Sequence, residues 1–214
     1  MYVPRHFAPP HDAALRALVR DHPLAALVVL GPDGLRASEV PLLLDPGPAP
    51  HGVLRGHVAR ANPVWRELAP DAPALAVFRG SEAYVSPSWY ATKRETGKVV
   101  PTWNYVTVHA HGALRAVDDR DWLREQIEAL TDQQEQALGR AGPWRVSDAP
   151  PDYVEKMLGA IVGLELRIER VEGSWKLSQN RSERDRDGVV EGLLAVGTEA
   201  AATVARLVRD AERS

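Results

Sequence analysis

The 214-residue chain contains no cysteine. Without thiols it can form neither disulfides nor thiolate metal sites, and it has no cysteine nucleophile. This absence fits a reducing compartment such as the cytosol, where disulfides are rare. A chain of this length can bury a sizeable core, so it does not need such cross-links for stability.

Long apolar runs and a strong net charge are also lacking. No run approaches the roughly 20 apolar residues of a membrane-spanning helix. The first residues, MYVPRHFAPPHD, have no apolar centre, so we expect no signal peptide. The formal charge is −3, which gives no sign of a nucleic-acid surface. We therefore expect a soluble cytoplasmic protein without membrane contact.

The chain alternates short apolar runs with turn residues, a pattern typical of strands in hairpin order. Helices are predicted at 11–22, near Asn62, from about Asp119, at 152–161, and in two pieces at the end of the chain. Strands are predicted at 23–30, 35–45, 53–58, 74–78, 82–86 and 98–117, with a strand or hairpin at 163–179. This order favours an α+β fold built on a small antiparallel β-barrel with peripheral helices.

Familiar catalytic motifs are missing from the sequence. There is no G-x-S-x-G, no H-E-x-x-H and no P-loop. His109 and His111 form an H-x-H pair on one strand face, but no third ligand can be identified, so we expect no metal site. The candidate sites therefore favour binding rather than acid–base catalysis.

The segment GHVARANPVW places His57, Arg60 and Asn62 beside a predicted helix start. Free backbone N–H groups at such a start, together with an arginine, can bind an anion. The alternative is an ordinary N-cap, with Asn62 capping, Pro63 at the first helical position and a solvated arginine.

Two aromatic segments, YVSPSWYATK and KVVPTWNYVTVHAHG, suit a flat heterocycle that needs stacking and edge hydrogen bonds. Alternation puts Thr102 and Asn104 on one strand face and Trp103 and Tyr105 on the other. A core role for the aromatic residues is the alternative. The candidate residues in the two segments are Ser86, Trp89, Tyr90, Thr102, Trp103 and Asn104.

A polar segment, KLSQNRSERDRDG, follows the last predicted strand directly. Lys176 and Gln179 are its candidate ligand-binding residues. The alternative is a solvated loop that runs into a helix capped by Ser182.

Several motifs together resemble one known family. They are MYVPRHF, GHVARANP, AYVSPSWY, VPTWNYVTVHAHG, MLGAIVGLELRIERVEGSWKLSQNR and DRDGV, in this order from Met1 to about Leu194. They closely resemble the PaiB family of FMN-binding negative transcriptional regulators, which has the FMN-binding split-barrel fold of pyridoxamine-phosphate oxidases. We therefore expect a split-barrel domain at 1–196 and a helical tail at 197–214.

The resemblance implies a homodimer with FMN sites at the subunit interface. It implies that His57, Arg60 and Asn62 hold the FMN phosphate, and that Lys176 and Gln179 reach the flavin across the dimer. It also places Ser38, Glu39 and Pro41 beside the isoalloxazine, with the aromatic segments lining the ring or ribityl chain.

Three functions remain open at the sequence level. The first is a flavin-binding regulator that lowers transcription. Neither charge nor a recognisable motif supports direct DNA binding, so it would act through a partner protein or need charge clustered in the dimer. The second function is an FMN-dependent oxidoreductase acting on a small molecule or a reduced nicotinamide. A haem-binding split barrel, with His57, His109 or His111 as axial ligand, is the third.

Overall fold

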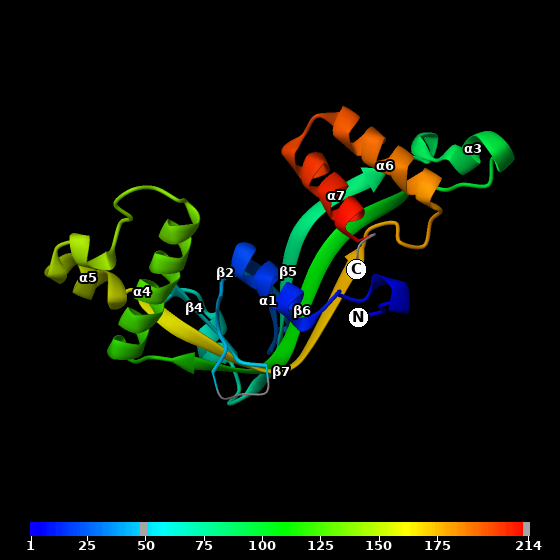
Figure 1. Ribbon diagram of the computed structural model, residues 1–214. Helices are drawn as coiled ribbons and strands as arrows, with labels where there is room; N and C mark the ends of the chain where they lie inside the picture. Colours follow the sequence, from blue (N-terminus) through cyan, green and yellow to red (C-terminus); the bar gives the residue numbers. More distant parts are fainter. Residues whose placement is uncertain (48–50, 212–214) are drawn as a thin grey trace. The chain divides into compact units, whose positions relative to one another are not determined.

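The computed structural model describes residues 1–47 and 51–211 (Figure 1). The predicted tail at 197–214 thus falls partly outside the described residues. The helical elements are η1 Arg5–Phe7, α1 Asp12–Asp21, α2 Val64–Glu67, η2 Pro87–Trp89, α3 Ala91–Thr96, α4 Arg120–Ala137, η3 Val146–Asp148, α5 Pro151–Leu158, α6 Glu183–Val196 and α7 Glu199–Asp210. The strands are β1 Leu24–Gly31, β2 Gly34–Pro41, β3 Leu43–Asp45, β4 Val53–Ala59, β5 Ala72–Val85, β6 Thr102–Val117 and β7 Ile161–Lys176.

The chain divides into two compact units, which are described separately. Unit 1 comprises Met1–Leu18, Arg79–Val108 and Glu172–Ser214, and unit 2 comprises Val19–Phe78 and His109–Val171. The long strands β5, β6 and β7 each contribute residues to both units. No helix among the described residues is long and apolar enough to cross a membrane.

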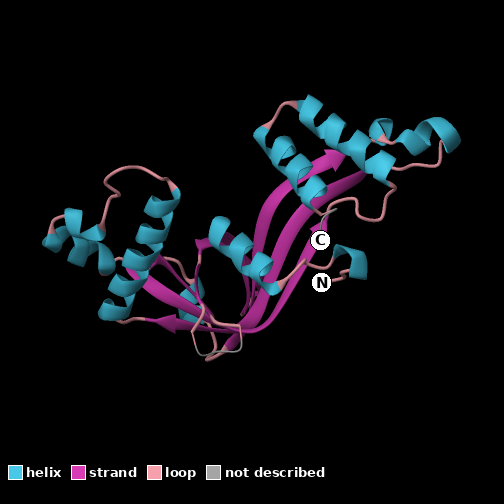
Figure 2. Ribbon diagram, in the orientation of Figure 1, coloured by secondary structure: helices cyan, strands magenta, loops and turns pink. Residues whose placement is uncertain are grey.

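Unit 2 contains part of every strand of a seven-stranded antiparallel sheet, in the order β2-β1-β5-β6-β7-β4-β3 (Figure 2). The mixed α+β class predicted from the sequence is confirmed. Strand β2 is at one edge and pairs with β1 from Leu24↔Pro41 to Gly31↔Gly34. Pro41 therefore lies on an edge strand, so its missing N–H does not remove a hydrogen bond from the centre of the sheet.

Helix α4 packs on the sheet of unit 2 and carries its own core cluster. Asp119 caps the helix by accepting a hydrogen bond from the Trp122 backbone N–H at 2.8 Å. The buried residues Leu123, Val146, Val154 and Leu158 then join α4, η3 and α5 in one apolar cluster. This packing fixes the segment that enters β7.

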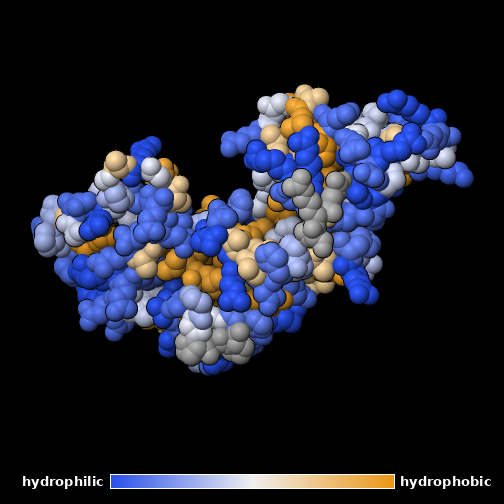
Figure 3. All heavy atoms as spheres, in the orientation of Figure 1, coloured by the Kyte–Doolittle hydropathy of each residue, from blue (hydrophilic) through white to orange (hydrophobic). Residues whose placement is uncertain are grey.

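Unit 1 carries the C-terminal helices. Ser182 and Thr198 cap α6 and α7, each accepting a hydrogen bond from a backbone N–H three residues later. Each of the two helices buries an apolar face, and Val189 of α6 and Val204 of α7 are fully buried. Where α6 meets α7, Figure 3 shows hydrophobic residues at the surface, and Leu194 and Val196 are both exposed there.

Three predicted elements differ from the structure. The separate strands expected at 74–78 and 82–86 form one continuous strand, β5. The strand expected at 35–45 is interrupted at Leu42, whose N–H bonds to the carbonyl of Pro23 instead. For 163–179, where the sequence left a strand or a hairpin open, the structure has a single strand, and it ends at Lys176 rather than at residue 179.

Candidate functional site

The predicted site residues fall into two groups, one in each unit. Unit 2 contains Ser38, Glu39, Pro41, His57, Arg60 and Asn62. Unit 1 contains Ser86, Trp89, Tyr90, Thr102, Trp103, Asn104, Lys176 and Gln179.

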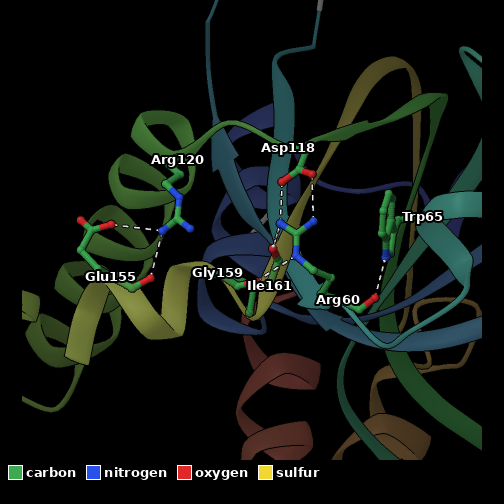
Figure 4. Close-up of polar contacts among 7 residues, drawn as sticks. All are labelled: Arg60, Trp65, Asp118, Arg120, Glu155, Gly159 and Ile161. Atoms are coloured by element: carbon green, nitrogen blue, oxygen red, sulfur yellow. Dashed lines mark hydrogen bonds and ion pairs between the residues drawn. The ribbon is translucent and has the colours of Figure 1, made fainter. Parts of the chain in front are cut away.

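Arg60 forms the most extensive hydrogen-bond network of the unit 2 group (Figure 4). Its Nη1 and Nη2 donate to the two carboxylate oxygens of Asp118 at 2.8 and 2.5 Å. Its Nε donates to the Gly159 carbonyl at 2.9 Å, and Nη2 also donates to the Ile161 carbonyl at 3.0 Å. The guanidinium thus ties Asp118 to the turn between α5 and β7, and a phosphate bound there would compete with Asp118.

The pair also changes the acidity of its carboxylate. The hydrogen bond from Arg60 lowers the pKa of Asp118, and this outweighs the rise that partial burial causes. The same bond raises the pKa of Arg60, although burial opposes the rise. Arg60 and Asp118 therefore stabilise each other's charged forms.

The other two members of the predicted anion cradle have local partners too. The Nδ1 of His57 lies 2.8 Å from Oε1 of Gln126, a buried side chain of α4. Oδ1 of Asn62 accepts a hydrogen bond from the Val64 backbone N–H at 3.0 Å. Helix α2 begins at Val64, one residue later than predicted, so the N-cap is Pro63 and the predicted N-cap role of Asn62 is wrong. Helix α2 is only four residues long, so its N-terminus offers little to an anion.

The remaining unit 2 candidates lie at the end of edge strand β2. Ser38 and Pro41 are half-buried and Glu39 is exposed. Ser38 and Glu39 pair with Leu27 and Ala26 of β1. Their role beside a flavin ring stays a prediction.

Four of the eight unit 1 candidates line one pocket. It offers about 40 Å³ to the centres of water-sized spheres, enough for about three waters because one water needs about 10–15 Å³ on this measure. Four of the predicted residues line it, together with four that were not predicted. The full set is Phe7, Tyr90, Thr102, Asn104, Lys176, Ser178, Asn180 and Arg181.

Asn104 and Ser178 form the buried floor of this pocket. Asn104 is fully buried, and its side-chain amide exchanges hydrogen bonds with the Ser178 hydroxyl at 3.0 and 3.1 Å. Ser178 has φ of +66°, a left-handed conformation that non-glycine residues adopt only where their surroundings enforce it. The pairing with Asn104 holds the chain in this tight turn.

Gln179 stabilises the same turn from within. Its side-chain Oε1 accepts from the Leu177 N–H at 2.8 Å and its Nε2 donates to the Trp175 carbonyl at 2.6 Å. The amide is thus used to shape the backbone between β7 and α6. Its predicted reach across a dimer stays a prediction.

Two cations line the pocket. Nζ of Lys176 donates to Oγ1 of Thr102 at 2.8 Å and lies 5.8 Å from the centre of the Tyr105 ring. The guanidinium carbon of Arg181 lies 4.9 Å from the centre of the Tyr90 ring, within the range of a cation–π contact. Lys176 is half-buried. The Lys176 ammonium and the Arg181 guanidinium each carry more N–H donors than these contacts use.

Tyr90 has a buried hydroxyl that lacks a hydrogen-bond partner of good geometry among the described residues. Leaving such a group unpaired costs about 1–3 kcal/mol. Burial raises the pKa of this hydroxyl, and the charge of Arg181, together with a hydrogen bond of poorer geometry from its side chain, opposes the rise in part. A ligand in the pocket that accepts a hydrogen bond would supply the missing partner.

The opposite face of β6 carries exposed aromatic residues, as the alternation predicted. Trp103 is 51% exposed and meets Tyr84, 47% exposed, edge to face with ring centres 6.0 Å apart. The small polar side chain of Asn104 points the other way, into the pocket. One strand therefore offers a polar pocket on one side and an aromatic surface on the other.

Ser86 and Trp89 have packing and capping roles. The Ser86 hydroxyl accepts from the Ser88 N–H at 3.2 Å and caps η2. The Trp89 indole lies on α6, where a Cβ on Gly192 would come within 2.2 Å of its ring. Trp89 thus joins η2 to α6.

Sequence reasoning missed Arg181, Ser178, Asn180 and Phe7. The sequence does contain a signal for Arg181, because it ends the motif SWKLSQNR, which also contains Lys176 and Gln179. It was interpreted as part of a solvated charged loop. Only the fold shows that this loop turns back over β6.

Comparison with known proteins places the chain in a family. Residues 1–170 match the family model described as "Putative FMN-binding domain", and this match covers most of the chain. The chain belongs to this family, the PaiB family. The resemblance inferred from the sequence motifs is confirmed.

Relatives of the PaiB-family chain are similar over nearly their whole length. An uncharacterized protein of Emericella nidulans, AN0679, is 36% identical, with 98% of this chain and 97% of that protein covered. The protease synthase and sporulation protein PAI 2 of Bacillus subtilis is 30% identical over the same shares. The flavocytochrome Anf3 of Azotobacter vinelandii is 14% identical but has the same fold, with a TM-score of 0.61 over 87% of this chain and 78% of that one. The split-barrel fold is thus confirmed.

Proposed function

We propose that this protein binds FMN in a site that unit 1 provides in part and a second copy of the chain completes. The observation that carries the proposal is the pocket of unit 1, which gathers Tyr90, Thr102, Asn104 and Lys176 from separate segments. All four were candidate flavin contacts on chemical grounds. Membership of the PaiB family supports the same cofactor.

The side chains available in unit 1 fit the chemistry of FMN. Lys176 and Arg181 supply positive charge for a phosphate, and Thr102 and Asn104 supply hydroxyl and amide groups for polar edges. Trp103 and Tyr84 offer exposed ring faces and edges for stacking. Bound FMN would supply redox chemistry at its ring, while these residues would bind and orient it.

The size of the pocket is the reason for proposing a second copy. Sites for ligands of this kind usually have volumes of about 300–1,000 Å³. The pocket of one chain holds about three waters, so it cannot enclose an isoalloxazine ring. A partner that places its own exposed Trp103 and Tyr84 over the mouth of the pocket would enclose the ring between the two chains.

Control of transcription is the cellular role that PaiB-family membership suggests for such a protein. The formal charge of −3 does not favour direct contact with DNA, so we propose that any such control acts through a partner protein. An oxidoreductase role would show as oxidation of NADH or NADPH faster than with the same concentration of free FMN.

The proposal is tested by titrating FMN into the protein and following flavin fluorescence. Trp103→Ala should weaken FMN binding about tenfold or more, because it removes an aromatic stacking surface. Trp144→Ala is the matched control, since Trp144 lies in unit 2 and is 48% exposed, against 51% for Trp103. Equal FMN affinity in wild type and Trp103→Ala would contradict the site. Failure of the wild type to bind FMN at all would contradict the function.

A further inference from the structure

Positive charge gathers at the pocket of unit 1 without a matching acid. The lining includes Lys176 and Arg181 but no carboxylate. Among residues 1–47 and 51–211, neither cation is within ion-pair distance of an Asp or Glu. Lys176 instead donates to the neutral Thr102 hydroxyl, and Arg181 lies against the Tyr90 ring.

Asp185 is the acid whose charge influences Arg181, and it is already satisfied. It is buried, and its two carboxylate oxygens accept hydrogen bonds from the Thr92 backbone N–H at 2.9 Å and the Thr92 hydroxyl at 2.7 Å. Burial raises the pKa of Asp185, but the Thr92 bonds and the charge of Arg181 lower it further than burial raises it. Asp185 therefore offsets part of the Arg181 charge without taking its hydrogen-bond donors.

Tyr90 provides an independent sign of a missing acceptor. Its side chain is 1% exposed and lines the pocket. Arg181 lies close enough to the hydroxyl to lower its pKa, but within the described chain no acceptor of good geometry receives the hydroxyl's own proton. A hydroxyl donates to an anion readily. A buried donor and two cations thus line the same small space.

The frame around these groups is rigid. The strained Ser178 backbone is held by Asn104, and the Gln179 amide ties the turn from Trp175 to Leu177. A turn fixed in this way sets the positions of Lys176 and Arg181 before any ligand arrives. Preorganised donors bind an anion at a lower entropic cost than mobile ones.

The volume and the donors together define the ligand. About 40 Å³ on the water-sphere measure suits a group of a few heavy atoms, and the two cationic donors favour an acceptor with negative charge. We infer that this pocket is an oxyanion site for a phosphate group, either free or as the monoester end of a larger molecule. Arginine and lysine both favour phosphate, and the tyrosine hydroxyl adds a third donor.

The probe for this inference is inorganic phosphate, added to the full-length protein in a chloride buffer and followed by titration calorimetry. Arg181→Gln should lower the affinity for phosphate about tenfold, as expected for a lost charge-assisted contact. Tyr90→Phe should lower it several-fold. Because it also removes an unpaired buried hydroxyl, it should leave the thermal midpoint unchanged or raise it.

Arg94→Gln is the control, because it removes the same charge from an exposed position on α3 outside the pocket. It should bind phosphate like the wild type. No heat of phosphate binding to the folded wild type would overturn the inference. Equal losses of affinity in Arg94→Gln and Arg181→Gln would overturn it as well, since they would indicate a general charge effect. The thermal melt of each variant shows that it is folded.

A competition experiment distinguishes the two sources of phosphate. Assigning the pocket to the phosphate of FMN rests on the proposed function. In that case inorganic phosphate should weaken FMN binding but not riboflavin binding, and Arg181→Gln should remove the preference for FMN over riboflavin. Phosphate binding that leaves FMN affinity unchanged would support the pocket as a separate oxyanion site. A protein that binds phosphate but no flavin would retain this inference and contradict the proposed function.

Discussion

At the scale of single residues, Arg60 shows how a hydrogen-bond network can change the interpretation of a motif. The sequence presents it as a free cation beside a helix start, which is the usual pattern of an anion site. In the structure Asp118, 58 residues away in sequence, binds it on two nitrogens. No local pattern could have revealed this partner, because only the packing of the turn before β7 brings the two together.

The Arg60–Asp118 pair predicts a specific pH dependence of stability. The folded-state pKa of Asp118 is lowered, so its contribution is fully present above the ordinary carboxyl pKa of about 4 and is lost as pH falls through the lower folded value. Asp118→Asn should therefore lower the thermal midpoint at pH 7, and the gap to the wild type should shrink in strongly acidic buffer.

Asp132→Asn is the control for that experiment, since Asp132 is an exposed residue of α4. Its melting curve should follow the wild type at both pH values. A gap between Asp118→Asn and the wild type that stays constant, or grows, as the pH falls would contradict the ion-pair assignment.

At the scale of elements, the sequence predicted the strands and the longer helices, but it missed α3 and the short helices η1, η2 and η3. It also failed where local turn signals were misleading. Gly80 and Ser81 suggested a break, yet they lie within the continuous strand β5. Glycine and serine only weaken a strand locally, while pairing with neighbouring strands favours its continuation. At Leu42 a signal was present, because Pro41 directly before it cannot donate a ladder hydrogen bond, but the apolar run that follows favoured continuing the strand.

The contact between Trp89 of η2 and helix α6 depends on two glycines of α6, Gly188 and Gly192. In an ordinary exposed helix, Gly→Ala stabilises by about 1 kcal/mol. At Gly192 the added Cβ would lie 2.2 Å from the Trp89 ring, so we expect Gly192→Ala to destabilise by about 1–3 kcal/mol instead. Urea unfolding measures the difference.

Ala195 provides the matched comparison on the exposed side of α6. Ala195→Gly should cost about 1 kcal/mol from helix propensity alone. Combining Gly192→Ala with Trp89→Leu should recover much of the loss, because the smaller side chain makes room. A stabilising Gly192→Ala would show that Trp89 does not pack against α6.

At the scale of the whole molecule, sequence motifs identified the family, whose model is described as a putative FMN-binding domain, but they could not show the amount of enclosed space. The pocket of one chain has room for a phosphate group and not for a flavin ring. The exposed rings of Trp103 on β6 and Tyr84 on β5 contact each other on the face of β6 that lies away from the pocket. Both features are accounted for if the flavin ring lies between two copies of the chain.

The most direct test of this account is the mass and flavin content of the protein after saturation with FMN, measured together by light scattering and absorbance during gel filtration. The account predicts a particle of twice the 23.5 kDa chain mass that carries one FMN per chain. A monomer that binds FMN stoichiometrically would contradict the shared site, and a dimer that retains no flavin would contradict FMN as the ligand.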